Sequence, residues 1–191
     1  MTRQNDSRRF QFKRDVLDAR EMELIIRRMA GQLVEQTRDL DSVLLVGIRT
    51  RGLPLAERLV EEVERQEGVR LPLGALDITL YRDDLSTIAP QPVVKGTHFP
   101  EAIDDRLVVL TDDVLYTGRT VRAALDELKD WGRPRAVRLA VLIDRGHREL
   151  PIQADIIGKQ LPTARSELVE VAFVATDGED SVKLFERGEV A

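Results

Sequence analysis

One segment near the middle of the chain constrains the fold more than any other. The apolar run Leu107–Leu110 leads into the acidic pair Asp112-Asp113, then into Thr117-Gly118-Arg119-Thr120, and then into an apolar pattern with helical spacing. A short, continuous apolar run of this kind is typical of a strand that is covered on both faces. The segment therefore predicts a strand, a polar turn and a helix in immediate succession.

The rest of the chain repeats this alternation of strands and helices. A capping box at Asp18 begins a predicted helix that runs to about Thr37, and Pro54 fits the first turn of a second helix. Further strands are predicted at the apolar segments Val43–Ile48, Leu73–Leu80, Ala136–Ile143, Leu168–Ala175 and Val182–Phe185, the last two at the far end of the sheet. This order predicts an α/β fold with a mostly parallel central sheet flanked by helices. Ligands of such sheets bind beyond the carboxyl ends of the strands.

Composition excludes several classes of protein. The 191 residues include no cysteine, so disulfides and cysteine chemistry are excluded, and the net charge of −5 leaves any nucleic-acid role to a local patch. No run approaches the roughly 18 apolar residues of a membrane span. We expect a soluble, cytoplasmic protein without a membrane partner.

The polar turn after the central strand has the chemistry of a ribose phosphate site. The first N–H groups of a helix lack internal partners, Gly118 lets the backbone approach an anion, and Thr117 and Thr120 add hydroxyl donors. Two carboxylates beside a phosphate cradle suit a ligand with a neighbouring cis-diol, such as the ribose 5-phosphate of phosphoribosyl diphosphate (PRPP). The alternative is that the acids merely end the strand and Thr120 caps the helix. Neither the dinucleotide-binding nor the P-loop glycine pattern is present.

The segment resembles the signature of type I phosphoribosyltransferases. The string DDVLYTGRTVRAALDEL is similar to one branch, the bifunctional pyrimidine operon regulators with uracil phosphoribosyltransferase activity. Four further segments of the chain resemble the same branch: VGIRTRG (46–52), DITLYRDDL (77–85), LAVLIDRGHRELPIQADIIGK (139–159) and PTARSE (162–167). The resemblance implies a type I phosphoribosyltransferase fold with a small hood region. It assigns residues 17–191 to a single domain and leaves residues 1–16 as a basic N-terminal tail, either disordered or an aid to RNA binding.

The resemblance implies an enzyme that converts uracil and PRPP to UMP and pyrophosphate. Catalytic roles fall to Asp112, Asp113 and Arg82, the last in a loop that closes over the site. PRPP and its phosphates would be bound by Thr50, Arg51, Gly52, Leu115, Tyr116, Thr117, Gly118, Arg119 and Thr120. Backbone groups at Ile156 and Ile157 would read the base, although both side chains fit a plain core equally well. Magnesium is implied as the cofactor, bound through PRPP rather than by a dedicated set of protein ligands.

The resemblance also implies RNA binding. Members of this branch bind the leader messenger RNA of pyrimidine genes when uridine nucleotides such as UMP or UTP are present. The matching basic residues are Arg27, Arg145, His147, Arg148 and Lys159. From charge alone, solvated arginines beside a strand are favoured over a polyanion-binding face for the stretch around Arg145. Gly31 offers no side chain where the branch often has a polar one.

Two other functions compete with the bifunctional enzyme. One is an RNA-binding nucleotide sensor with little or no catalysis. Such a sensor would not need the segment Thr50-Arg51-Gly52, which matches the family's pyrophosphate loop, or the closing loop, and both are intact here. The other is a purine phosphoribosyltransferase, against which the branch-specific string DRGHRELP argues. A homodimer or homotetramer is implied by the resemblance alone.

Overall fold

The computed structural model describes residues 10–37, 39–79 and 96–188. Its larger sheet has the strand order β3-β2-β4-β5-β6, and all neighbouring strands are parallel. These strands are Leu73–Leu76 (β3), Val43–Ile48 (β2), Leu107–Leu115 (β4), Ala136–Asp144 (β5) and Ile156–Gln160 (β6). The predicted mostly parallel sheet is confirmed. The strand predicted from Leu73 ends at Leu76, and Leu80, its predicted last residue, lies outside the described part of the chain.

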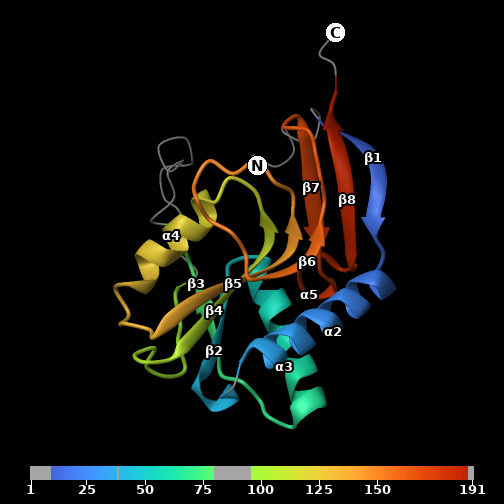
Figure 1. Cartoon of the computed structure of the whole chain (residues 1–191). Helices are drawn as coiled ribbons and strands as arrows, with labels where there is room; N and C mark the ends of the chain where they lie inside the picture. Colours follow the sequence, from blue (N-terminus) through green and yellow to red (C-terminus); the bar gives the residue numbers. More distant parts are fainter. Residues whose placement is uncertain (1–9, 38, 80–95, 189–191) are drawn as a thin grey trace.

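Helices cover both faces of this sheet (Figure 1). Helices α2 (Ala19–Gln36) and α3 (Gly52–Glu67) pack on one face, where Leu45 and Val109 join their buried core. Helix α4 (Arg119–Leu128) packs on the other face, against neighbours such as Leu44 and Val108. Successive strand residues point to opposite faces, so a strand covered on both sides must be apolar at every position, as β2 is.

The predicted start of the first helix is confirmed in atomic detail. The Asp18 side chain accepts a hydrogen bond from the Glu21 amide at 2.8 Å, and the Glu21 side chain accepts one from the Asp18 amide at 3.0 Å. These two bonds satisfy donors that the first helical turn cannot pair internally. A short 3-10 helix, Leu40–Ser42, then leads into β2.

A second, smaller sheet corrects two predictions. Strands β1 (Phe10–Leu17), β8 (Ser181–Arg187) and β7 (Glu167–Ala172) form an antiparallel sheet in the order β1-β8-β7. Residues 10–16 are therefore not a tail, and the two C-terminal strands do not extend the main sheet. On this sheet Phe12 packs edge-on against Phe185 of β8, with ring centroids 6.0 Å apart, and Lys13 pairs with Glu167 of β7. Residues 1–9 lie outside the described part of the chain.

The central strand is also longer than predicted. Beyond Leu110, β4 continues alongside β5, with Asp112 opposite Val141 and Leu115 opposite Asp144. The acidic pair therefore lies within the strand rather than in a loop.

The short helix α5 (Val174–Asp177) lies between β7 and β8. In the described ranges, no helix is both long and apolar enough to cross a membrane.

Candidate active site

The carboxyl ends of the parallel strands gather the polar loops. The segment after β2 contains Thr50, Arg51 and Gly52, the segment after β4 contains Tyr116 to Gly118, and a longer segment follows β5. Neighbouring parallel strands end at one edge of the sheet, so these loops border a common space. Arg82, in the loop that is predicted to close over the site, lies outside the described residues.

The turn after β4 has the backbone that the sequence predicted. Gly118 has φ +92°, in the left-handed region that favours glycine, and it directly precedes helix α4. The Thr117 carbonyl accepts hydrogen bonds from the Glu149 and Leu150 amides at 2.9 and 3.2 Å. The segment after β5 therefore holds the turn in place, and helix α4 begins directly after the turn. Arg119 at that end pairs with Glu149 at 2.8 Å, whereas Thr120 is exposed. Leu115 is buried as the last residue of β4.

The acidic pair sits just ahead of this turn. Asp112 is buried and Asp113 is half-buried, and the Asp113 amide donates to the Asp112 carboxylate at 3.0 Å. Burial raises the pKa of the Asp113 carboxyl, while the hydrogen bond to Asp112 and the charge of Arg51 act in the opposite direction. The structure thus brings the carboxylate of Asp113 and the guanidinium of Arg51, from two different strand ends, within electrostatic reach of each other.

The segment after β2 presses closely against the central strand. The Arg49–Thr50 peptide bond is cis, and Gly52 begins helix α3. A Cβ atom on Gly52 would stand 2.2 Å from the Thr111 carbonyl oxygen, so only glycine fits there. Thr111 reinforces the contact, because its hydroxyl donates to the Gly52 carbonyl at 2.8 Å. This packing fixes the loop beside the acidic pair.

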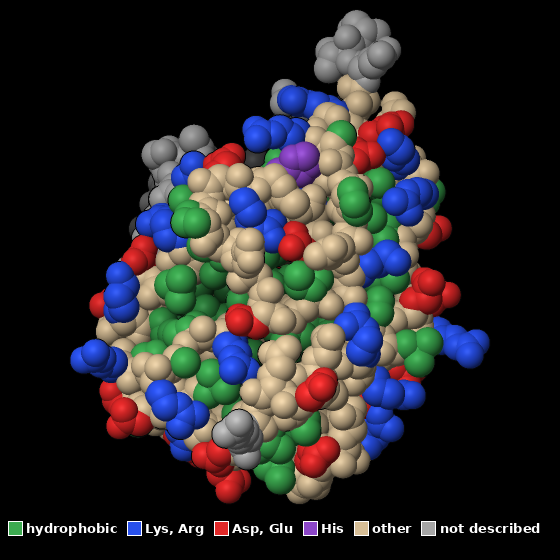
Figure 2. Space-filling view, in the orientation of Figure 1, with side chains coloured by type: hydrophobic (Ala, Val, Ile, Leu, Met, Phe, Trp, Pro, Cys, Tyr) green, Lys and Arg blue, Asp and Glu red, His purple; other side chains and the backbone are tan. Residues whose placement is uncertain are grey.

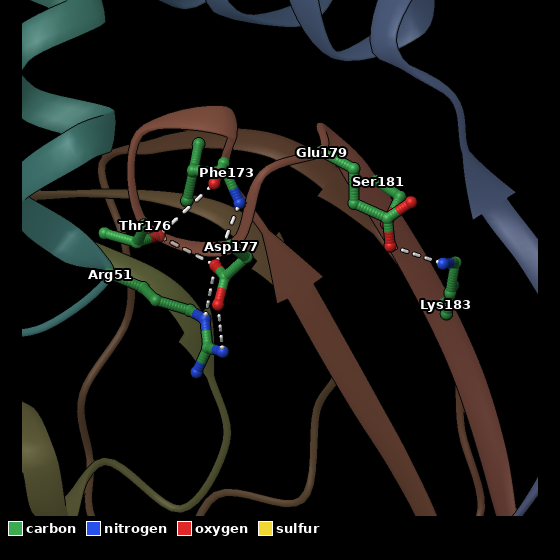
Figure 3. Close-up of polar contacts among 7 residues, drawn as sticks. All are labelled: Arg51, Phe173, Thr176, Asp177, Glu179, Ser181 and Lys183. Carbon is green, nitrogen blue, oxygen red and sulfur yellow. Dashed lines mark hydrogen bonds and ion pairs between the residues drawn. The ribbon is translucent and has the colours of Figure 1, made fainter.

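Asp177 is a site residue that the sequence reasoning missed. Its carboxylate accepts hydrogen bonds from Arg51, at 2.9 Å from Nη2 and 3.3 Å from Nε (Figure 3). Asp177 belongs to α5 and is separated from Arg51 by 126 positions. No spacing rule links residues so far apart, and the acids around Asp177 look like an ordinary polar turn in the sequence.

The predicted base-reading residues lie at the start of β6. Ile156 pairs with Ala140 in the middle of β5 and is 2% exposed within the core, while Ile157 packs against the cluster on the opposite face. The Ile157 carbonyl accepts a hydrogen bond from Arg28 of α2 at 3.3 Å. The core interpretation holds for the Ile156 side chain, whereas Ile157 is opposite Val141 of β5, which is in turn opposite Asp112 of β4.

The basic residues of the segment after β5 form hydrogen bonds within the protein. Arg145 is 5% exposed, and its guanidinium donates to the Thr163 hydroxyl at 3.2 Å and to the Ala164 and Glu167 carbonyls at 3.1 and 2.7 Å. Burial lowers the pKa of Arg145, with the charges of Tyr116 and Glu167 opposing. The interpretation of this arginine as solvated is therefore wrong, and its guanidinium is not presented to a partner.

The two neighbouring basic residues behave similarly. Arg148 donates to the carbonyls of Ile152 and Tyr116, both at 2.9 Å, and pairs with Asp144 at 2.7 Å. His147 has φ +61°, and its Nε2 lies 2.6 Å from the Thr163 carbonyl. Their polar atoms hold the segment to its surroundings.

Two of the predicted RNA contacts remain accessible. Lys159 at the end of β6 is exposed, and Arg27 on α2 is exposed and pairs with Glu23 at 2.7 Å. In Figure 2 the basic side chains are interleaved with acidic ones over the visible face and do not form one continuous patch. Of the five predicted RNA-binding residues, Arg27 and Lys159 are thus the two that are exposed.

Comparison with known proteins agrees with this geometry. Residues 14–172 match the family model described as phosphoribosyl transferase domain. The chain therefore belongs to the phosphoribosyl transferase family, and it is a phosphoribosyltransferase of the type I fold. The solved hypoxanthine phosphoribosyltransferases of Trypanosoma cruzi and Staphylococcus aureus share the fold, with TM-scores of 0.70 and 0.67. They are only 14% and 17% identical, over 92% and 90% of this chain and 92% of each of theirs.

Curated relatives narrow the family further. A protein of Deinococcus radiodurans named "Bifunctional protein PyrR" is 53% identical over 91% of this chain and 95% of its own length. Proteins of the same name from Thermus thermophilus and Clostridioides difficile are 53% and 49% identical, over 92% and 91% of this chain and 97% and 98% of their own lengths. The chain thus belongs to the PyrR branch, and the purine enzymes are distant relatives in fold.

Proposed function

We propose that the protein is a uracil phosphoribosyltransferase, which makes UMP and pyrophosphate from uracil and PRPP, and that it also regulates pyrimidine genes through their leader RNA. The observation that carries the enzymatic part is the acidic pair of β4. It stands between the amino end of α4 and the tightly packed loop of Arg51 and Gly52. This arrangement offers separate places for a 5-phosphate, a ribose and a diphosphate.

Each part of the site matches one part of PRPP. The amino end of α4, with Tyr116 to Thr120, would bind the 5-phosphate through N–H groups and hydroxyls. Asp112 and Asp113 would accept hydrogen bonds from the ribose hydroxyls. Their negative charge would also stabilise the positive charge that develops on the sugar as the diphosphate leaves. Arg51 and the backbone at Gly52 would bind the diphosphate.

The residues present fit a magnesium ion that arrives with its substrate. Among the described residues, no group of three acidic or histidine side chains could hold a metal by itself. A magnesium ion bound to the diphosphate and ribose oxygens would neutralise the departing diphosphate, and the nearby acidic pair adds favourable charge. Catalysis then depends mainly on positioning and electrostatics. From its sequence position, we assign Arg82 to the diphosphate as well.

The regulatory part rests on the PyrR relatives and on fewer residues than the sequence suggested. Lys159 and Arg27 are exposed and would contact RNA phosphates directly. Arg145, His147 and Arg148 would act indirectly by holding the segment after β5 in shape. UMP or UTP in the active site would control this binding. We place the protein in the cytoplasm as a homodimer or homotetramer.

The enzymatic proposal is tested by supplying magnesium, PRPP and one nucleobase at a time, and measuring pyrophosphate release. We expect release with uracil. Release with hypoxanthine or guanine alone would move the protein to the purine enzymes. No release with any base, together with nucleotide-dependent RNA binding, would favour a regulator that only senses nucleotides.

A further inference from the structure

The contact between Arg51 and Asp177 has a specific geometry. The carboxylate approaches the guanidinium from the side and takes one hydrogen from Nε and one from Nη2 (Figure 3). A guanidinium carries five N–H donors in a rigid plane. The side-on pair uses two of them and leaves the edge formed by Nη1 and Nη2 available for a second, planar interaction with oxygen atoms.

Asp177 is itself firmly held. Its carboxylate accepts hydrogen bonds from the Thr176 hydroxyl at 2.7 Å and from the Phe173 amide at 3.1 Å. Partial burial raises the pKa of Asp177, but the hydrogen bonds from Arg51, Thr176 and Phe173 outweigh it and bring the pKa to about 2. The carboxylate is therefore ionised at any physiological pH and is fixed before a ligand arrives.

We propose that Asp177 is a positioning residue for diphosphate binding, which orients the guanidinium of Arg51 so that its open edge faces the diphosphate oxygens. This inference rests on the proposed function. A long arginine side chain loses considerable rotamer freedom when it binds a ligand. Asp177 fixes that rotamer in advance, so less binding energy is lost when PRPP or pyrophosphate arrives.

The same turn provides a matched control. Asp180 accepts a hydrogen bond from the Val174 amide at 2.9 Å and pairs with Arg58 of helix α3 at 2.8 Å. This second ion pair also ties the turn between β7 and β8 to α3, but Arg58 lies two helical turns beyond Arg51. Loss of the Asp180 pair should affect the turn without affecting the guanidinium that faces the diphosphate.

The test compares Asp177→Asn and Asp180→Asn in the full chain. Calorimetry would measure the Kd of magnesium pyrophosphate, and steady-state kinetics would measure kcat and the KM for PRPP and for uracil. We expect Asp177→Asn to raise the pyrophosphate Kd and the PRPP KM about tenfold, with kcat and the uracil KM changed less than twofold. Asp180→Asn should leave all four values near those of the wild type. Equal weakening by both variants, or no weakening by Asp177→Asn, would overturn the proposal.

A double-variant comparison separates positioning from direct contact. If Asp177 acts only through Arg51, then Arg51→Ala with Asp177→Asn should bind magnesium pyrophosphate as weakly as Arg51→Ala alone. If the two losses instead add, Asp177 contacts the ligand or its metal directly and the positioning role is wrong. Calorimetry needs no turnover, so an inactive wild type that still binds pyrophosphate would contradict the proposed enzyme, while the Kd comparison among the variants would still support or overturn the role of Asp177.

Discussion

The guanidinium of Arg145 lies over the ring of Tyr116, with Cζ 4.1 Å from the ring centroid. Tyr116 belongs to the turn at the end of β4, and Arg145 begins the segment after β5. The imidazole of His147 meets the same ring edge-on, with centroids 5.9 Å apart. The turn after β4 is therefore held to the neighbouring segment through an aromatic ring as well as through backbone hydrogen bonds.

Replacement of Arg145 by alanine should destabilise the fold. The change would remove the cation–π contact and leave the carbonyls of Ala164 and Glu167 without this donor, at a cost of about 2–4 kcal/mol. Urea unfolding would measure the lost free energy. The salt dependence of RNA binding by the folded variant should stay the same, because the buried guanidinium does not contact phosphate. A shallower salt slope would show that Arg145 contacts RNA after all.

Replacement of Lys159 by alanine should weaken RNA binding without destabilising the fold. Lys159 is exposed at the end of β6, so its loss should leave the free energy of unfolding within about 0.5 kcal/mol of the wild type. We expect weaker leader-RNA binding and a salt slope reduced by about one unit, as for the loss of one phosphate contact. Filter binding at several salt concentrations would measure both. Unchanged RNA affinity would remove Lys159 from the RNA surface.

Replacement of Gly52 by alanine should distort the loop after β2. The new Cβ would lie 2.2 Å from the Thr111 carbonyl oxygen, and neither backbone can yield without moving β4 or α3. We expect a loss of about 2–3 kcal/mol of stability and a sharply weaker affinity for magnesium pyrophosphate. Gly31→Ala is a suitable control. Gly31 lies in α2 with its nearest neighbour 3.7 Å from the added atom, so the helix should gain up to about 1 kcal/mol.

Acid should weaken the contact between the β7–β8 turn and α3. The pKa of Asp177 is lowered to about 2 in the folded protein. Its contribution to the free energy of unfolding is therefore present above the ordinary pKa of 3.8 and is lost as the pH falls toward 2. Because the turn is open to solvent, we expect a contribution of only about 1 kcal/mol. Unfolding midpoints between pH 5 and pH 2 should therefore fall less steeply in Asp177→Asn than in the wild type. Parallel curves would contradict this assignment.

The local parts of the fold and site were predictable from the sequence. The capping box at Asp18, the buried strand Val43–Ile48, and the order of acidic pair, Gly118 turn and helix all depend on residues close together in the chain. Backbone conformation, helix capping and apolar periodicity are set at short range, so a linear pattern reveals them. The same local order pointed to a ribose phosphate site.

The tertiary structure alone decided which distant segments meet. The pairing of β1 with β8, the hold of Asp177 on Arg51, and the burial of Arg145 each join residues that no local pattern relates. Alternating apolar residues identify a strand but not its partner, and a charged side chain looks the same in sequence whether it is solvated or enclosed. Residues close together in the chain therefore set the chemistry at the carboxyl ends of the strands. Packing determined which charges face a ligand and which hold the protein together.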